Sequence, residues 1–74
     1  MAVYPAAARD LGMQGIVTVA VRVDSRGDLK SAHILKSSGH PILDDAALRA
    51  AVASTYRATA SGKLYKIEYS FSLQ

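Results

Sequence analysis

Four residues whose side chains could do chemistry lie close together in the middle of the chain: Ser37, Ser38, His40 and Asp44. They offer a hydroxyl nucleophile, an imidazole base and a carboxylate, which are the ingredients of a hydrolase triad. A triad also needs the base within hydrogen-bond reach of the nucleophile and a third group that orients it. Serine and aspartate at the start of a helix are more simply explained as turn and cap residues. We therefore predict no catalytic residue, and a chain this small offers little depth for a ligand pocket of about 300 Å³ or more.

Metal and cofactor chemistry finds little support in the residue types. His33 and His40 are the only histidines, and the chain has no cysteine. Two histidines on separate elements, without thiolates, do not make the ligand set of a zinc site. We predict no metal and no cofactor.

The charge pattern argues against a nucleic-acid partner. The formal net charge is +3, and the basic residues are scattered along the chain. A nucleic-acid-binding domain concentrates its basic residues on one stripe, often with interleaved aromatic residues. The four tyrosines, Tyr4, Tyr56, Tyr65 and Tyr69, are instead spread over several predicted elements. We expect core and edge roles for them, and solubility as the role of the charge.

The length sets the scale of the fold. Seventy-four residues make one domain, 1–74, with a thin stability margin. No apolar stretch reaches the roughly 20 residues that span a bilayer, so we expect no direct membrane contact by this segment.

The first half of the chain predicts a short helix followed by a hairpin. Pro5 to Leu11 reads as a helix with proline at its start and Gly12 just past its end, docked through Tyr4 and Leu11. In Gly15 to Val23, valine recurs at every second position, which predicts a strand with one apolar face. A turn around Gly27 leads to a return strand, Leu29 to Ser37, with a bulge expected between His33 and Leu35.

The second half predicts a helix and a last strand. From Pro41 to about Thr55, apolar and small residues fall on one arc at helical spacing: Leu43, Ala47, Ala50, Ala51 and Ser54. Leu48 and Val52 form a competing flank. Leu64 to Leu73 alternates apolar and polar residues and is the strongest amphipathic strand of the chain.

This order predicts an α+β fold with a three-stranded, antiparallel or mixed sheet, of the split β-α-β type. The helix between the second and third strands makes those two strands parallel, and the first strand fits between them. Both helices then cover the valine face. The last strand lies at an edge, where unpaired backbone groups invite another strand. We therefore expect it to bind an extended peptide by β-strand addition.

The motif order resembles the C-terminal domain of TonB-type energy transducers over nearly all of the chain. The resemblance is carried by Tyr4-Pro5, Gly15-x-Val17-x-Val19, Gly27, Ser37-Ser38-Gly39, Leu43-Asp44, Ala46-Ala47 and Phe71-x-Leu73. It implies a periplasmic domain, cut from a longer protein that is anchored in the inner membrane. It also implies that the last strand pairs with the N-terminal peptide of an outer-membrane receptor, coupling the inner-membrane proton gradient to uptake of siderophores or other nutrients. Motor proteins of the inner membrane would be contacted through the missing N-terminal part.

The resemblance implies a set of partner-binding residues along the last strand: Tyr65, Lys66, Ile67, Glu68, Tyr69, Ser70, Phe71, Ser72 and Leu73. Arg57 is a further candidate from its position after the main helix, where it could reach a partner carboxylate or equally be a solvated charge near the helix end. Ala58 stands where the family often has proline. Family members carry partner-contacting residues just before Tyr-Pro, where this chain has only Met1, Ala2 and Val3.

Two other functions stay open on the sequence. The bare last strand could pair with that of a second copy and form a homodimer. The domain could also be an envelope adaptor of similar build, such as a TolA-like domain, with a different protein partner.

Overall fold

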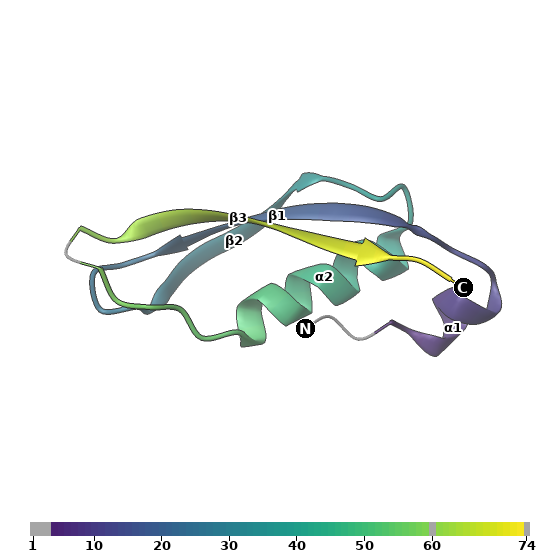
Figure 1. Ribbon diagram of the computed structural model, residues 1–74, viewed down its shortest axis with the longest axis horizontal. Coiled ribbons are helices and arrows are strands. Elements are labelled where there is room, and N and C mark those ends of the chain that lie inside the picture. The colour runs from purple at the N-terminus through teal and green to yellow at the C-terminus, as the bar shows by residue number, and fades with distance from the viewer. Residues whose placement is uncertain (1–3, 60, 74) are drawn as a thin grey trace.

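The computed structural model describes residues 4–59 and 61–73 (Figure 1). Within them the elements follow in the order α1 (Ala6–Asp10), β1 (Gly15–Val23), β2 (Leu29–Lys36), α2 (Pro41–Ala53) and β3 (Lys63–Phe71). The strands form a single sheet in the order β2-β1-β3, and β1 is antiparallel to both neighbours. The predicted α+β class, strand order and edge position of the last strand are confirmed.

The central strand β1 owes its position to its valines. The side chains of Val17, Val19, Val21 and Val23 are all buried. Arg22, on the opposite face, is exposed. The strand has the bounds that the alternation predicts, because a period of two places the β-branched residues on the face that α2 covers.

The hairpin between β1 and β2 is closed by local polar contacts. Gly27 has φ +89°, a conformation that glycine adopts without steric cost. The carboxylate of Asp24 accepts hydrogen bonds from the backbone N–H groups of Arg26 and Asp28, both at 2.9 Å. These contacts explain why the chain reverses within a few residues.

The return strand β2 contains the predicted bulge. Val19 pairs with Ile34 and the neighbouring Thr18 pairs with Lys36, so that Leu35 is the extra residue. β2 ends at Lys36, one residue earlier than predicted.

The helix α2 packs through the predicted arc, with Leu43, Ala47 and Ala51 fully buried. Small residues at two of these three positions let the helix lie close to the sheet. Of the competing flank, Val52 is 54 % exposed, whereas Leu48 is partly buried and packs against the core. The helix ends at Ala53 and not at Thr55.

The short helix α1 docks differently from the prediction. Tyr4 does pack inward: its ring meets that of Phe71 edge-on at 5.4 Å, and its hydroxyl donates to the carbonyl oxygen of Met13. The expected contact through Leu11 is wrong, since this side chain is 71 % exposed. Leu11 caps the C-terminal end of the helix, where the chain turns away, and Ala8 is the residue that enters the core.

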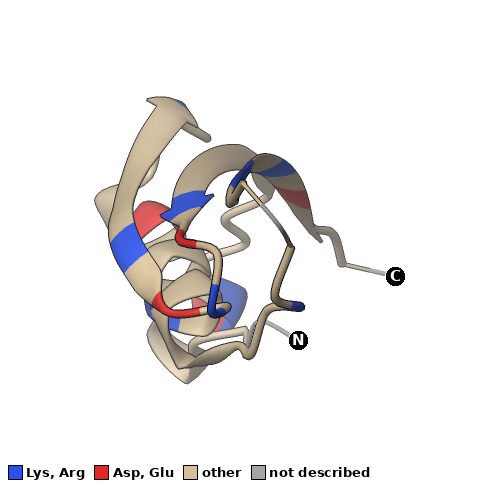
Figure 2. Ribbon diagram, turned by 90° about the vertical axis from the view of Figure 1, so that its left-hand side faces the viewer, with Lys and Arg blue, Asp and Glu red and all other residues tan. Residues whose placement is uncertain are grey.

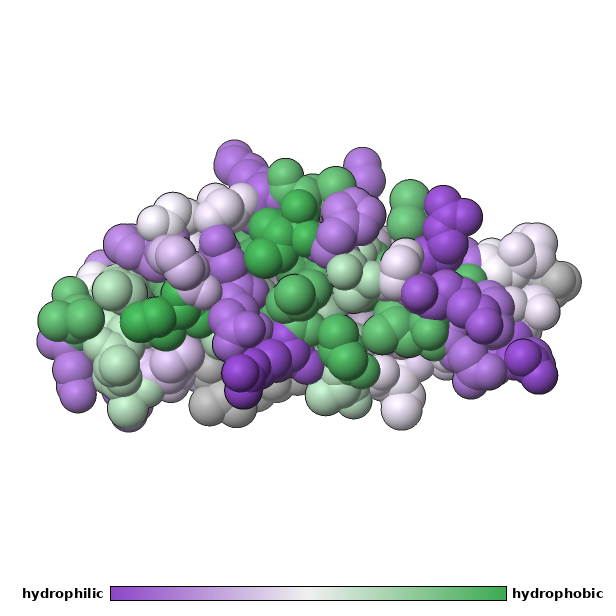
Figure 3. Space-filling model, turned by 180° about the vertical axis from the view of Figure 1, so that it is seen from behind, coloured by the Kyte–Doolittle hydropathy of each residue, from purple (hydrophilic) through white to green (hydrophobic). Residues whose placement is uncertain are grey.

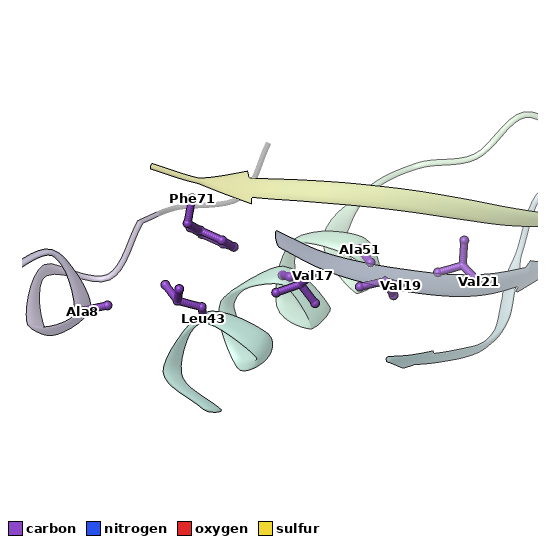
Figure 4. Close-up of a cluster of buried hydrophobic side chains, with 8 residues drawn as sticks. Ala8, Val17, Val19, Val21, Leu43, Ala51 and Phe71 are labelled. Atoms are coloured by element: carbon purple, nitrogen blue, oxygen red, sulfur yellow. The ribbon is translucent and has the colours of Figure 1, made fainter. Parts of the chain in front are cut away.

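The core runs along the long axis of an elongated molecule that measures 43 × 18 × 17 Å. At one end Phe71 and Leu43 lie near Ala8, and the valines of β1 continue the row past Ala51 (Figure 4). Seen along this axis, α2 lies beneath β1 and β2, and β3 extends beyond it on the other side (Figure 2). Within the described residues, neither helix has the length and apolar character that crossing a bilayer requires.

Candidate peptide-binding edge

The last strand β3 pairs with β1 in an unbroken register. The pairs run from Gly15 with Phe71 to Val23 with Lys63, without a bulge. On its other side β3 has no strand neighbour among the described residues. The sheet therefore ends in a regular strand of nine residues.

This edge exposes backbone hydrogen-bonding groups. In an antiparallel pair, every second residue turns its N–H and C=O groups away from the neighbouring strand. In the described part of the chain, none of the backbone hydrogen bonds made by turns and loops reaches β3. The outward row is thus free to pair with another extended chain.

The inner face of β3 carries an apolar row that is only half covered. Phe71 is buried, whereas Tyr65, Ile67 and Tyr69 are each partly exposed. Tyr56, from the segment that follows α2, covers Tyr65 with the two ring centroids 5.4 Å apart. The row stays incomplete because α2 lies under the other two strands. A strand added beside β3 would bury more of this apolar surface.

The hydroxyls of Tyr56 and Tyr69 have raised pKa values and are neutral at ordinary pH. Burial raises the pKa of Tyr69 above its usual value. Burial, together with the nearby Tyr69, also raises the pKa of Tyr56. The inner face therefore presents uncharged aromatic surface to an incoming strand.

The outer face of β3 is polar and solvated. Its exposed side chains are Leu64, Lys66, Glu68 and Ser70. The Nζ atom of Lys63, at the start of the strand, lies 5.0 Å from the ring centroid of Tyr65. A strand paired with β3 would therefore fit best with polar side chains on the outer face and apolar side chains on the inner face, at alternate residues.

The structure places most of the predicted partner-binding residues on this edge. Residues 65–71 belong to β3. Ser72 and Leu73 lie beyond its end, where the N–H of Leu73 donates to Oε1 of Gln14 at 3.0 Å. The strand begins at Lys63, one residue before the start that the alternation predicts. The available signal was Gly62, which has φ +76° and ends the turn.

Arg57 lies outside the edge, in the extended segment between α2 and β3. Its side chain is exposed and makes none of the ion pairs found in the described residues. Residues 1–3, upstream of Tyr-Pro, lie outside the described residues.

Comparison with known proteins agrees with this geometry. Residues 2–73 match the family model described as the C-terminal part of the Gram-negative bacterial TonB protein. The chain belongs to the TonB C-terminal family. A curated relative, protein TonB of Neisseria gonorrhoeae, is 36 % identical over 70 residues. The match covers 95 % of this chain and 24 % of that relative, so the chain spans about a quarter of the relative's length. The family resemblance predicted from the motifs is confirmed.

In this TonB-family domain the serine-rich motif before α2 is hydrogen-bonded to Asp44 and covers the first turn of the helix as a cap, although the N-cap residue His40 makes no side-chain capping bond. The carboxylate of Asp44 accepts hydrogen bonds from the hydroxyl of Ser37, from the N–H of Ser38 at 2.9 Å and from the hydroxyl of Ser38 at 2.8 Å. His40 joins through its backbone, whose N–H donates to the Ser38 hydroxyl at 3.1 Å. Both serine hydroxyls are directed to the carboxylate, whereas a triad needs the nucleophile paired with the imidazole.

The electrostatics of the cap fit a structural role. Burial acts to raise the pKa of Asp44, but hydrogen bonds from Ser37 and Ser38 outweigh it and leave the pKa below the ordinary value. The ionised carboxylate is therefore the form that the folded domain stabilises. It holds the loop after β2 against the first turn of α2.

An open hollow of the described surface lies elsewhere. It measures about 720 Å³ along the flank of α2 and is lined by residues that include Pro5, Ala46 and Ala50. This volume is larger than expected for so small a chain, but the hollow is open to solvent. Ser37, Ser38, His40 and Asp44 do not line it. No group of histidine and acidic residues suited to a metal ion occurs within 4–59 and 61–73.

Proposed function

We propose that this domain is the periplasmic, receptor-binding part of a TonB-type energy transducer. It binds an extended peptide at the N-terminus of an outer-membrane receptor by adding that peptide to the open edge of β3. The full-length protein is anchored in the inner membrane and couples the proton gradient there to transport through the receptor. This domain itself performs no catalysis and holds no cofactor.

The observation that carries the proposal is the regular, unpaired edge of β3. Natural sheets protect their edges with prolines, bulges, short strands or charged side chains. β3 has no proline and no bulge over its nine residues, although it carries Lys63, Lys66 and Glu68. Membership of the TonB C-terminal family supports the same partner. The edge residues of the proposed site are therefore 63–71, with Ser72, Leu73 and Arg57 as flanking candidates.

The geometry also suits the transmission of force. A peptide paired along β3 runs parallel or antiparallel to the long axis of the molecule (Figure 1). A pull along that axis loads the interstrand hydrogen bonds together and not one after another. A short peptide can therefore bear load without a deep pocket.

A peptide titration followed by NMR tests this function. An extended receptor-type peptide is expected to shift the backbone amides of β3, with weaker shifts in β1. The matched control is the same peptide with proline at one central position, which removes a backbone donor and forbids a continuous ladder. Shifts confined to α1, α2 or β2, or equal binding of the proline control, would contradict the proposal.

Self-association is the second candidate, because the same bare edge can pair with β3 of another copy. Light scattering over a concentration series separates the two functions. A domain that stays monomeric while binding the peptide supports the receptor function. A dimer that excludes the peptide supports self-association.

A further inference from the structure

Two exposed charges on β3 have no ion-pair partner among the described residues. Lys66 and Glu68 lie two residues apart and are both exposed on the outer face. In the register with β1 they stand opposite Ala20 and Thr18, neither of which is charged. In Figure 2 the acidic colour follows the basic colour along β3 towards the C-terminus.

Several other charges of the described chain are paired among themselves. Near the hairpin, Asp24 lies within ion-pair distance of Arg26 and Lys30. On α2, Nε of Arg49 lies 2.8 Å from a carboxylate oxygen of Asp45. None of the ion pairs in the described residues includes Lys66 or Glu68. Both charges are therefore available to a strand that adds to the edge.

The positions of Lys66 and Glu68 can set the register in which an added strand pairs with β3. When a strand pairs with β3, the residues directly opposite Lys66 and Glu68 bring their Cβ atoms to within about 4.5–5.5 Å. Opposite charges at that distance stabilise the pair and like charges destabilise it. The residue between them faces Ile67 on the inner side, where an apolar side chain adds to the half-covered row.

We propose that Lys66 and Glu68 select the partner peptide and fix its register on β3. This inference rests on the proposed function. The preferred peptide carries an acidic and a basic side chain two residues apart, with an apolar residue between them. The acidic residue comes first if the peptide runs parallel to β3, and the basic residue comes first if it runs antiparallel. The preferred charge order therefore also reports the direction of the bound peptide.

The other edge of the sheet cannot make the same selection. β2 has the sequence LKSAHILK and contains no acidic residue. Its bulge at Leu35 also interrupts the ladder. A peptide with paired opposite charges therefore distinguishes β3 from β2 by chemistry as well as by regularity.

Three peptides test the inference. Each has nine residues, blocked ends that carry no charge, and alternating serine and valine. They differ only at two serine positions, two residues apart, which hold Glu and Lys, Lys and Glu, or Ser and Ser. Dissociation constants come from NMR titration, which also reports whether β3 amides shift. We expect one charged order to bind about 5- to 30-fold more tightly than the other, with the serine peptide between them. Raised salt should reduce this preference and leave the affinity of the serine peptide nearly unchanged.

Two variants make the test specific. The exchange Lys66→Glu with Glu68→Lys keeps the net charge and should invert the preferred order. The matched control, Asp45→Arg with Arg49→Asp, exchanges an exposed pair on α2 and should leave the order unchanged. Circular dichroism confirms that both variants fold.

The outcomes separate the two proposals. If all three peptides bind at β3 with equal affinity, or if the exchange does not invert the order, charge selection is wrong while binding at the edge stands. If no peptide shifts β3 amides, the proposed function fails and charge selection fails with it.

Discussion

The two outer strands of the sheet differ in how regularly they pair with β1. β2 pairs with β1 with register shifts near both of its ends, and one of these shifts is the bulge that leaves Leu35 without a partner residue on β1. β3 follows β1 without a break over nine residue pairs. A bulge twists and interrupts an edge, which discourages further pairing.

The same two strands differ in how they are supported from below. α2 lies beneath β1 and β2, and the view from behind shows apolar side chains gathered near the middle of the molecule with polar ones between them (Figure 3). Aromatic contacts support β3 at both ends, Tyr56 against Tyr65 and Tyr4 against Phe71, and Ile67 and Tyr69 pack against the core between them. The inner faces of β2 and β3 are both only partly covered. The two edges therefore differ chiefly in regularity.

The largest expected effect comes from removing the anchor at the end of β3. Phe71 is 4 % exposed and belongs to the main core cluster. Phe71→Ala should lower the free energy of unfolding by about 3–5 kcal/mol, because it removes apolar contacts and leaves a cavity. Leu64→Ala on the same strand is the control, since Leu64 is 53 % exposed and should cost less than about 1 kcal/mol. Chemical denaturation measures both, and equal losses would mean that β3 is not anchored at this end.

A second test concerns the contact that ties the hairpin to the segment leading into β3. A Cβ atom at Gly27 would lie 2.7 Å from the carbonyl oxygen of Tyr56. Gly39 has nearly the same φ, +90° against +89°, and no atom within 4 Å of such a Cβ. Both alanine variants pay the left-handed backbone cost of about 1–2 kcal/mol. Gly27→Ala should cost about 1–3 kcal/mol more than Gly39→Ala because of the clash. Equal thermal stabilities of the two variants would show that the hairpin is not packed closely against the segment around Tyr56.

A third test concerns the cap that fixes the end of β2. The lowered pKa of Asp44 means that its ionised form stabilises the fold above the unfolded pKa. That contribution is lost as the pH falls from about 4 through the lower folded value. Asp44→Asn should cost about 1 kcal/mol at neutral pH and weaken the pH dependence below pH 4. Asp45→Asn is the control, and urea melts at several pH values check both. A variant that keeps the full acid dependence would exclude Asp44 as its source.

The sequence predicted those features that repeat along it. The valines fixed both the bounds of β1 and its buried face, and the pairing of β2 confirmed the bulge near Leu35. The alternation from Leu64 onward located β3, although Lys63 was missed and Ser72 and Leu73 lie past its end. In each case a period of two supplied the signal.

The features that were missed depend on contacts between distant segments. Leu11 was the expected contact of α1 because its side chain is large and apolar. The buried residue is instead Ala8, which lies in the same core cluster as Leu43. An alanine in a short helix does not indicate from the sequence that it is buried. The off-centre position of α2, which leaves the inner row of β3 half covered, follows from packing against β2. The unpaired state of Lys66 and Glu68 depends on which β1 residues stand opposite them, and that requires the register.

The smallest expected change in stability, and the most direct test of the edge comparison, comes from the bulge in β2. Deleting Leu35 would let Ile34 and Lys36 follow Val19 and Thr18 without an extra residue. We expect a change below about 1 kcal/mol, since Leu35 is 50 % exposed. The regular edge should, however, increase self-association, which sedimentation velocity over a concentration series measures. Leu35→Ala keeps the bulge and removes only the apolar side chain. If Leu35→Ala associates as strongly as the deletion, or if the deletion stays as monomeric as the parent, strand regularity is not what separates the two edges.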